Sequence, residues 1–454
     1  MKQTLKIGVS GVRGIVGQSF SPQLASTFAQ ALGTFVGPGE VLVGRDTRST
    51  GGMIEQAVMA GLLSVGCKPV LLGIVPTPSL LFMVRHRSAR GGIMITASHN
   101  SVEWNALKFV DRRGMFFSTI HAEELFDIYH QQEFPYVYET ELRTTRVLKD
   151  AVGPHFARIV SFVDAAAIRA AHFRVAVDCC NGVGALHSRT FLERHLNAQV
   201  VSIHDVPNGV FEREPEPLAE HLGALSSTVT KEQCAVGFAQ DPDGDRLAVI
   251  DEQGRPIGEE VTVALALRAV LTLHKLGPVA VNLSAGKSVE KVVEACGGQL
   301  IRTKTGEVHV CEAMERIGAV AGGEHTGGII VPAIHPSRDS FAGMALILEL
   351  MARTGESMSE LCGSVPRFAL IKERMPISSD QAPTMLRVLR KAYADYPMSF
   401  LDGVYIDLGD RWVHVRRSNT EPVLRIIAEA PTRGESEALI RDVRERLSVK
   451  EPTS

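Results

Sequence analysis

Apolar and polar positions follow two periods along the chain, one helical and one extended. After Ser21 and a proline, apolar residues recur at helical spacing, which predicts a capped helix with one apolar face. That face consists of Leu24, Phe28, Leu32 and Phe35. Short β-rich runs bounded by glycine or polar turns follow, and helical patterns separate them. This alternation is typical of parallel-sheet βαβ units, so it predicts an α/β protein.

Three predicted strands, 41–46, 175–178 and 279–282, end in the same way, at a polar turn followed by a helical segment. Further along the chain, each is followed by a second short apolar strand that ends in a loop rich in polar side chains. These loops are residues 96–100, 241–246 and 323–328. Ligand sites in α/β sheets lie beyond the strand ends. We therefore expect three α/β domains, each contributing one loop to a shared cleft.

The last part of the chain has a different pattern. Residues 403–416 are typical of a hairpin that turns at 409–410, residues 423–430 predict another strand, and a helix follows. The apolar positions of that closing helix are Ile440, Val443 and Leu447. This pattern predicts a smaller α+β domain.

The predicted fold is three tandem α/β domains with mixed, mainly parallel sheets, plus the C-terminal α+β domain, around a central cleft. The predicted boundaries are 1–150, 151–255, 256–365 and 366–454. A length of 454 residues suits three or four domains.

Charge and hydropathy exclude several kinds of partner. The net charge is −3, so no broad positive field attracts nucleic acid or an anionic membrane. The longest apolar stretch, 261–273, contains Arg268 and is shorter than the roughly 20 residues that span a bilayer, so we expect a buried helix there. The first residues lack the apolar core of a signal peptide. We expect a cytoplasmic protein, monomeric or homodimeric.

The seven cysteines point to the same compartment. They are odd in number, scattered and without C-x-x-C spacing, which argues against both a disulfide framework and a zinc site. We expect reduced, mostly buried thiols.

Asp241, Asp243 and Asp245 alternate with a proline and a glycine that bend the backbone, so three carboxylates can face one point. Such a set suits Mg²⁺, which favours a few carboxylates together with a phosphate oxygen and waters. An EF-hand is an alternative, since Glu252 stands at loop position 12, but that motif needs glycine where this chain has Arg246. A solvated acidic turn is the purely structural alternative.

The same letters, Asp-x-Asp-Gly, also resemble the aspartyl-nucleophile loop of haloacid dehalogenase-type phosphatases. In that hypothesis Asp241 would carry the phosphoryl group. Asp245 stands where that motif has threonine or valine, which argues against it.

Ser98 follows an apolar strand and lies between Ala97 and His99, neighbours that leave its hydroxyl accessible. A serine in a turn can simply cap a helix, so this position alone is a weak signal. A serine nucleophile also needs a base, and an adjacent histidine more often positions a hydrogen bond. Lys108 is an alternative residue for proton transfer.

Two further loops offer polar groups. Residues 416–422 gather a guanidinium, hydroxyls, an amide and backbone N–H groups, which suits a phosphate, although an ordinary charged hairpin edge is the alternative. Its side chains are Arg416, Ser418, Asn419 and Thr420, with Arg425 on the next strand. In the third loop, Glu324 and Thr326 offer an acceptor and a hydroxyl among glycines, which would match sugar hydroxyls. A glycine-rich turn with a satisfied glutamate is the alternative there.

Together these motifs resemble the α-D-phosphohexomutase superfamily over essentially the whole chain, in the family's own order. The matching segments are 96–100 for the phosphoserine, 241–246 for the metal, 323–327 for the sugar and 416–422 for the phosphate. Arg13 matches an active-site arginine of the family. The resemblance implies Mg²⁺ bound by Ser98 and the three aspartates, with His99, Lys108 and Arg246 assisting.

The resemblance also implies a reaction. Phospho-Ser98 would give its phosphoryl group to a hexose monophosphate, the bisphosphate would turn around, and the other phosphoryl would return to Ser98. Segments 100–108 and 335–339 look similar to phosphoglucosamine mutases of the archaeal-like branch, which favours glucosamine 6-phosphate. Phosphomannomutase/phosphoglucomutase activity is the alternative, and a non-catalytic sugar-phosphate sensor is a remote one.

Overall fold

The computed structural model describes residues 5–8, 11–377, 381–418 and 423–448. The chain forms two compact units. The first contains residues 1–262 and 326–362, and the second contains residues 263–325 and 363–454.

The first unit begins with a seven-stranded sheet. Its strands β5, β3, β4 and β7 are parallel, whereas β1, β2, β6 and β5 pair in antiparallel fashion. In spatial order the strands are β1 (Lys6–Gly8), β2 (Gly11–Ile15), β6 (Trp104–Val110), β5 (Gly91–Ile95), β3 (Glu40–Arg45), β4 (Lys68–Ile74) and β7 (Arg146–Val147).

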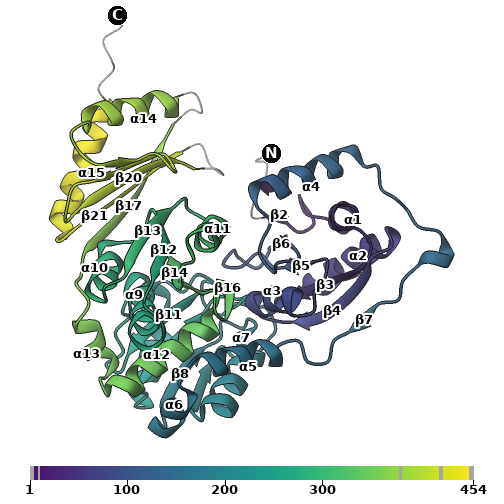
Figure 1. Ribbon diagram of the computed structural model, residues 1–454, viewed down its shortest axis with the longest axis horizontal. Coiled ribbons are helices and arrows are strands. Elements are labelled where there is room, and N and C mark those ends of the chain that lie inside the picture. The colour runs from purple at the N-terminus through teal and green to yellow at the C-terminus, as the bar shows by residue number, and fades with distance from the viewer. Residues whose placement is uncertain (1–4, 9–10, 378–380, 419–422, 449–454) are drawn as a thin grey trace, which may run out of the picture. The chain divides into compact units, whose positions relative to one another are not determined.

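Helices cover both faces of this sheet because its central strands are apolar on both sides. Helices α1 (Pro22–Val36), α2 (Gly51–Ser64) and α4 (Thr119–Gln131) share one apolar core, and α3 (Thr77–His86) packs into the other (Figure 1). Val41 and Val43 of β3 face the first core, and Leu42 between them faces the second. The predicted helix after Ser21 is confirmed, since the Ser21 hydroxyl accepts a hydrogen bond from the Leu24 N–H at 3.1 Å.

A second, four-stranded sheet also lies in the first unit. Its three parallel strands are β10 (Val236–Gln240), β8 (Arg174–Asp178) and β9 (Gln199–Ile203), with β11 (Leu247–Asp251) antiparallel at the edge. The hairpin of β15 (Gly328–Val331) and β16 (His335–Arg338) belongs to this unit as well. Its further helices are α5 (Gly153–Phe162), α6 (Ala165–Ala171), α7 (Gly184–Thr190), α8 (Gly223–Lys231) and α12 (Ser340–Thr354), with short helical turns at Glu139–Glu141, Phe191–His195 and Ala219–His221.

The second unit contains two sheets. In the first, β12 (Pro278–Asn282) pairs in parallel with β13 (Gln299–Thr303) and β14 (Ala321–Glu324), and α10 (Lys287–Ala295) and α11 (Glu307–Ile317) connect these strands. The chain passes between the units within α9 (Glu259–Ala269), after β14, and within α13 (Met358–Gly363). The expected buried helix over 261–273 is α9 with the turn Val270–His274 that follows it.

The second sheet of this unit is wholly antiparallel and agrees with the predicted C-terminal domain. Its spatial order is β17 (Ala369–Pro376), β21 (Val423–Ala430), β20 (Trp412–Arg417), β19 (Val404–Asp407) and β18 (Met398–Ser399). Helices α14 (Gln381–Ala392) and α15 (Arg433–Ser448) bury its apolar face (Figure 1). On the other face, Trp412 packs with Leu283, and the Glu429 carboxylate accepts hydrogen bonds from the Trp412 indole at 2.6 Å and the Lys287 N–H at 2.7 Å.

The predicted fold class is confirmed by these mixed α/β sheets and the smaller antiparallel domain. The exact domain boundaries stay predictions. All seven cysteines are free, and six of them are buried. Among the described residues, every helix is too short or too polar to cross a bilayer.

Candidate active site

The loop after β5 holds Ser98 in a conformation that few side chains adopt. Its φ is +49°, in the left-handed region, and the residue is 6% exposed. The Thr96 hydroxyl accepts a hydrogen bond from the Ser98 N–H at 2.9 Å, and the same hydroxyl donates to Asp46 at 2.7 Å. A left-handed serine costs free energy, so the surrounding contacts must impose it.

Arg48 supplies most of those contacts. Its guanidinium is fully buried and uses all five donors, with Nε on Asp46 at 3.0 Å. Nη2 donates to the carbonyls of Ser98 and Asn100, and Nη1 to those of Ser101 and Trp104, at distances of 2.6–3.1 Å. A charge paired and hydrogen-bonded in this way stabilises the loop strongly, because removing either partner would leave a buried charge.

The Ser98 hydroxyl points at the acidic loop. Its Oγ donates to Asp241 Oδ2 at 2.9 Å and lies 3.3 Å from His99 Nδ1. Burial, together with the charges of Arg246 and Arg338, lowers the pKa of His99 to about 2. His99 is therefore a neutral hydrogen-bonding group beside the serine.

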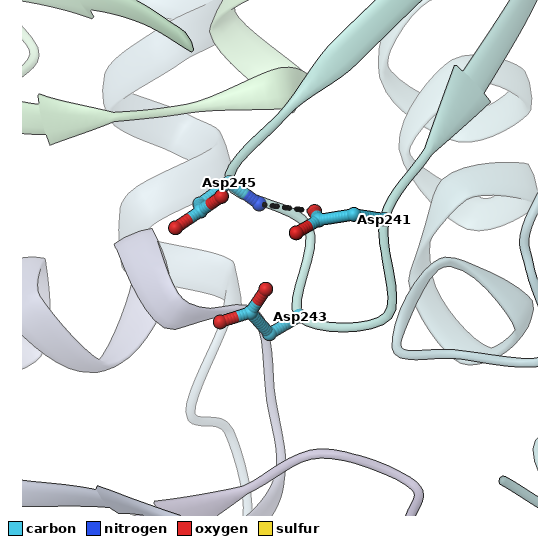
Figure 2. A group of neighbouring side chains, drawn as sticks. All are labelled: Asp241, Asp243 and Asp245. Atoms are coloured by element: carbon cyan, nitrogen blue, oxygen red, sulfur yellow. Dashed lines mark hydrogen bonds between the residues drawn. The ribbon is translucent and has the colours of Figure 1, made fainter. Parts of the chain in front are cut away.

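The three aspartates lie on the turn between β10 and β11 (Figure 2). Gly244 bends this turn with φ +72°, and Asp241 Oδ1 accepts hydrogen bonds from the N–H groups of Asp245 at 3.1 Å and Arg246 at 3.2 Å. One carboxylate oxygen from each aspartate lies within 4.8 Å of those of the other two, and all three residues are buried. This grouping is the predicted acidic triad.

The second oxygen of two aspartates is held by side chains from distant parts of the first unit. Asp243 Oδ2 accepts from Lys108 Nζ at 2.9 Å and from the Thr77 hydroxyl at 2.8 Å, and Asp245 Oδ2 accepts from Arg338 Nη2 at 2.6 Å. In contrast, the Oδ1 atoms of Asp243 and Asp245 are buried without a hydrogen-bond partner. An unmade hydrogen bond on a buried charged group costs about 1–3 kcal/mol or more, so these oxygens fit a bound cation.

Electrostatic interactions shift the pKa values of Asp241 and Asp243 in opposite directions. Burial and the charges of Asp243 and Asp245 raise the pKa of Asp241 well above its usual range. Burial acts in the same direction on Asp243, but the Lys108 ammonium and several hydrogen bonds outweigh it and lower the pKa. Burial would lower the pKa of Lys108, yet the charges of Asp243 and Asp245 outweigh it and raise that pKa. Lys108 is therefore a cation in this arrangement.

Two more of the predicted residues lie in the same unit. Arg246 Nη1 pairs with Glu216 at 2.7 Å, and Arg13 Nη1 donates to Asn100 of the serine loop at 3.1 Å. Burial and the neighbouring charge of Arg246 lower the pKa of Arg13. The first unit therefore brings together the acidic triad and five other predicted residues. These are Ser98, His99, Lys108, Arg13 and Arg246.

The EF-hand alternative for the acidic loop is wrong. Its twelfth-position ligand would be Glu252, but that carboxylate accepts hydrogen bonds from the N–H and hydroxyl of Ser359. The loop is also flanked by strands β10 and β11, whereas an EF-hand is flanked by helices.

In the second unit, Glu324 is the last residue of β14, not part of the following loop. Its Oε1 accepts from Asn282 Nδ2 at 3.1 Å and from the Gly306 N–H, at the start of α11, at 3.0 Å. Protein groups therefore already occupy this one oxygen. Thr326 lies in the three-residue turn that follows and is half-buried.

The predicted phosphate loop begins where β20 ends. Arg416 is directly opposite Arg425 on β21, and Arg425 is directly opposite Arg374 on β17. Burial and the charge of Arg425 lower the pKa of Arg416, whereas Asp402 and Glu324 act in the opposite sense. Asp402 lies 3.8 Å from Arg416 Nε, and the row places three positive charges in register across three strands, a grouping that suits an anion.

Ser418 is buried beside this row, and its N–H donates to the Val423 carbonyl at 2.9 Å. Asn419 and Thr420 lie outside the described residues. The sequence did not identify four residues that contribute to the site, because their contacts join segments far apart in the chain. These residues are Arg48, Thr77, Arg338 and Arg374.

Comparison with known proteins agrees with this architecture. Four consecutive phosphoglucomutase/phosphomannomutase domains match the chain: alpha/beta/alpha domain I at residues 4–136, domain II at 154–254, domain III at 258–368, and the C-terminal domain at 370–446.

Relatives match over nearly their whole length. A probable phosphoglucosamine mutase of Methanopyrus kandleri is 37% identical over 97% of this chain and 96% of its own. A phosphoglucomutase/phosphomannomutase of Thermococcus kodakarensis is 34% identical over 93% of this chain and 94% of its own. The crystal structure of a putative phosphomannomutase from Thermus thermophilus superposes with a TM-score of 0.83 at 27% identity, covering 99% of this chain and 100% of that one.

The fold and these matches define an isomerase of the phosphohexomutase class, which moves a phosphoryl group between two positions of a hexose phosphate. More particularly, the chain belongs to the phosphoglucomutase/phosphomannomutase family within the α-D-phosphohexomutase superfamily.

Proposed function

We propose that this enzyme interconverts glucosamine 6-phosphate and glucosamine 1-phosphate through a phosphoserine at Ser98 and a bisphosphate intermediate. The observation that carries this proposal is the Ser98 hydroxyl, 2.9 Å from Asp241 and beside three clustered carboxylates. The choice of sugar is supported by relatives that are named probable phosphoglucosamine mutases, at 33–37% identity.

The reaction needs two phosphoryl transfers. In the first, a hydroxyl oxygen of the hexose monophosphate bonds to the phosphorus on Ser98 and the Ser98 O–P bond breaks. The hydroxyl's proton ends on the Ser98 oxygen, and Lys108, held close to Asp243, is the residue proposed to relay it. After the bisphosphate turns around, Ser98 attacks its other phosphoryl group, and the same steps run in reverse.

Mg²⁺ is the proposed cofactor, held by Asp241, Asp243, Asp245 and an oxygen carried by Ser98. When bound, it would neutralise charge on the transferring phosphoryl group. This assignment is supported by the two buried carboxylate oxygens without partners and by the all-oxygen donor set, which suits a hard cation.

The remaining residues bind and orient the substrate. Arg416, Ser418, Asn419, Thr420 and Arg425 are proposed to hold the phosphate that is not being transferred. Arginine suits this task because its planar fork binds phosphate through two bonds. Glu324 and Thr326 are proposed to contact sugar hydroxyls, and Arg13, His99 and Arg246 to surround the phosphoryl group on Ser98. A cytoplasmic location is supported by the seven free thiols.

Phosphomannomutase/phosphoglucomutase activity is the second candidate, because the Thermococcus relative of that name is 34% identical. The kcat/KM values for the 6-phosphates of glucosamine, mannose and glucose separate the two. A higher value for mannose or glucose would replace glucosamine as the preferred sugar.

The direct test is Ser98→Ala. We expect turnover of glucosamine 6-phosphate to fall by more than about 10³-fold, since removing a nucleophile abolishes the covalent route. Ser101→Ala is the matched control, because its exposed hydroxyl reaches only Glu103, at 2.7 Å. Wild-type turnover in Ser98→Ala would contradict the proposal.

Intact-mass analysis detects the phosphoryl group, and fragmentation of the phosphorylated peptide locates it. Phosphate on Ser98 supports the mutase. Phosphate on Asp241 would indicate the dehalogenase-type route, and an unphosphorylated protein without turnover would indicate a sugar-phosphate sensor.

A further inference from the structure

We propose that Arg338 is a positioning residue for the acidic triad, acting through Asp245. The inference rests on the proposed function in one respect, namely that the triad binds a divalent cation. Arg338 is the last residue of β16, and its Nη2 donates to Asp245 Oδ2 at 2.6 Å. The Asp245 side chain is 1% exposed and that of Arg338 is 11% exposed, so the pair is largely shielded from water.

The contact completes a pattern around the triad. Each aspartate has at least one oxygen engaged by the protein: Asp241 Oδ1 by backbone N–H groups and its Oδ2 by the Ser98 hydroxyl, Asp243 Oδ2 by Lys108 and Thr77, and Asp245 Oδ2 by Arg338. The Oδ1 atoms of Asp243 and Asp245 stay without hydrogen-bond partners. A carboxylate fixed through one oxygen presents the other in a defined direction, which is how outer partners orient metal ligands.

A glycine makes room for this arginine. The Arg338 side chain packs against Gly328 of β15. A Cβ added at Gly328 would come within 2.3 Å of Arg338 Cδ and 2.8 Å of its Cγ. These atoms belong to the middle of the side chain, so any larger residue at 328 would displace Arg338. Substitution of Gly328 therefore moves the guanidinium without changing its charge.

The residue after Arg338 anchors the strand end. Asp339 Oδ1 caps α12 by accepting from the Phe341 N–H at 2.9 Å, and Asp339 Oδ2 contacts His155 Nε2 at 3.0 Å. His155 Nδ1 in turn lies 2.9 Å from the Ser79 hydroxyl. This serine, histidine and aspartate are all buried, so no substrate reaches them. Their contacts tie together α3, α5 and the start of α12, and thereby hold the backbone that carries Arg338.

Two roles for Arg338 predict opposite effects on cation binding. If it only compensated charge, its removal would leave the triad more negative and the cation would bind more tightly. If it positions Asp245, its removal frees a buried carboxylate to rotate and the cation binds more weakly, typically by about 10–100-fold for lost outer partners.

The experiment titrates the full-length protein with Mn²⁺ and measures free Mn²⁺ by electron paramagnetic resonance, without substrate. We expect Arg338→Met and Gly328→Ala to raise the Kd at least about 10-fold. Arg338→Lys should restore part of the affinity. Arg353→Met is the matched control, because it removes an exposed arginine–aspartate pair with Asp164 in the same unit and should leave the Kd unchanged. In turnover assays, kcat should fall in Arg338→Met while the KM for the sugar phosphate stays near wild type.

Unchanged or tighter Mn²⁺ binding in folded Arg338→Met overturns the inference. If that variant does not fold, as judged by circular dichroism, Gly328→Ala decides in the same way. Failure of the wild-type protein to bind Mn²⁺ is a distinct result, because it removes the proposed metal site itself.

Discussion

The acidic triad of the first unit and the arginine row of the second unit gather charges of opposite sign, and they are held in different ways. Around the triad, protein groups of opposite sign donate hydrogen bonds to one oxygen of Asp243 and of Asp245, and the Oδ1 atoms of these two residues have no hydrogen-bond partner. In the row, Arg374, Arg425 and Arg416 stand in register across three strands. The first arrangement suits a small cation, whereas the second gathers positive charge in a way that suits an anion.

The difference shows two ways to prepare a binding site. The triad is preorganised, because its carboxylates are held by residues from α3, β6 and β16 before any ligand arrives. The arginine row is set by strand register, and the structure shows Asp402 3.8 Å from Arg416 Nε. We therefore expect substitutions at the triad to affect the chemical step and substitutions in the row to affect substrate binding.

The largest effect is expected for Asp243→Asn. The change removes the charge of a proposed metal ligand and leaves the largely buried Lys108 ammonium poorly compensated, so kcat should fall by about 10³-fold or more. The assay is steady-state turnover of glucosamine 6-phosphate at saturating Mg²⁺. Asp395→Asn, at an exposed position in the other unit, serves as the control. A kcat within a few-fold of wild type would show that the triad is not needed for the chemistry.

An intermediate effect is expected for Arg416→Ala. Loss of the proposed charge-assisted phosphate contact should raise the KM for the sugar phosphate by about 10–100-fold, with kcat changed much less. Arg433→Ala is the control, since that arginine is 82% exposed and pairs only locally with Glu437. If kcat fell and KM did not change, the proposed distinction between the two regions would be lost.

The smallest effect is expected on the stability of the folded protein at acid pH, through His335. Burial lowers the pKa of His335 to about 3, and its Nε2 lies 2.8 Å from the Gly114 carbonyl. As the pH falls below about 6.5, the unfolded chain binds a proton on this histidine and the folded chain does not. Stability therefore falls between about pH 6.5 and pH 3, by up to about 1.4 kcal/mol per pH unit for one proton.

His335→Gln keeps an N–H donor for the Gly114 carbonyl but cannot titrate. The loss of melting temperature between pH 7 and pH 5 should be smaller in this variant than in the wild type. An equal loss in both proteins would mean that His335 does not contribute to the acid sensitivity.

The sequence was sufficient for much of the fold and for the chemistry-bearing loops. Local signals such as Ser21 before an apolar helix, or three alternating aspartates between apolar strands, depend on neighbours in the chain. They predicted α1, the β10–β11 turn and the C-terminal hairpin correctly. Glu324 was expected in a loop, but it is the last residue of β14, and its Oε1 accepts hydrogen bonds from Asn282 and Gly306.

The supporting residues could not be predicted in the same way. Arg338 meets Asp245 across 93 positions of sequence and Lys108 meets Asp243 across 135, so only the packing of the first unit identifies these partners. The row of Arg374, Arg425 and Arg416 needs the pairing of β17, β21 and β20, which periodicity does not give. The sequence shows that residue 328 is a glycine, but only the structure explains it, because the Arg338 side chain leaves no room there for a Cβ.

The five hydrogen bonds of the Arg48 guanidinium have a consequence for turnover. Because four of them end on carbonyls at residues 98–104, the segment around Ser98 is ordered when the chain folds, before any sugar phosphate binds. The entropy of immobilising Ser98, the proposed nucleophile, is then lost once in the life of the molecule, and no catalytic cycle has to lose it again. Lysine, with three donors on a single nitrogen, could not reach four separated carbonyls and Asp46 together.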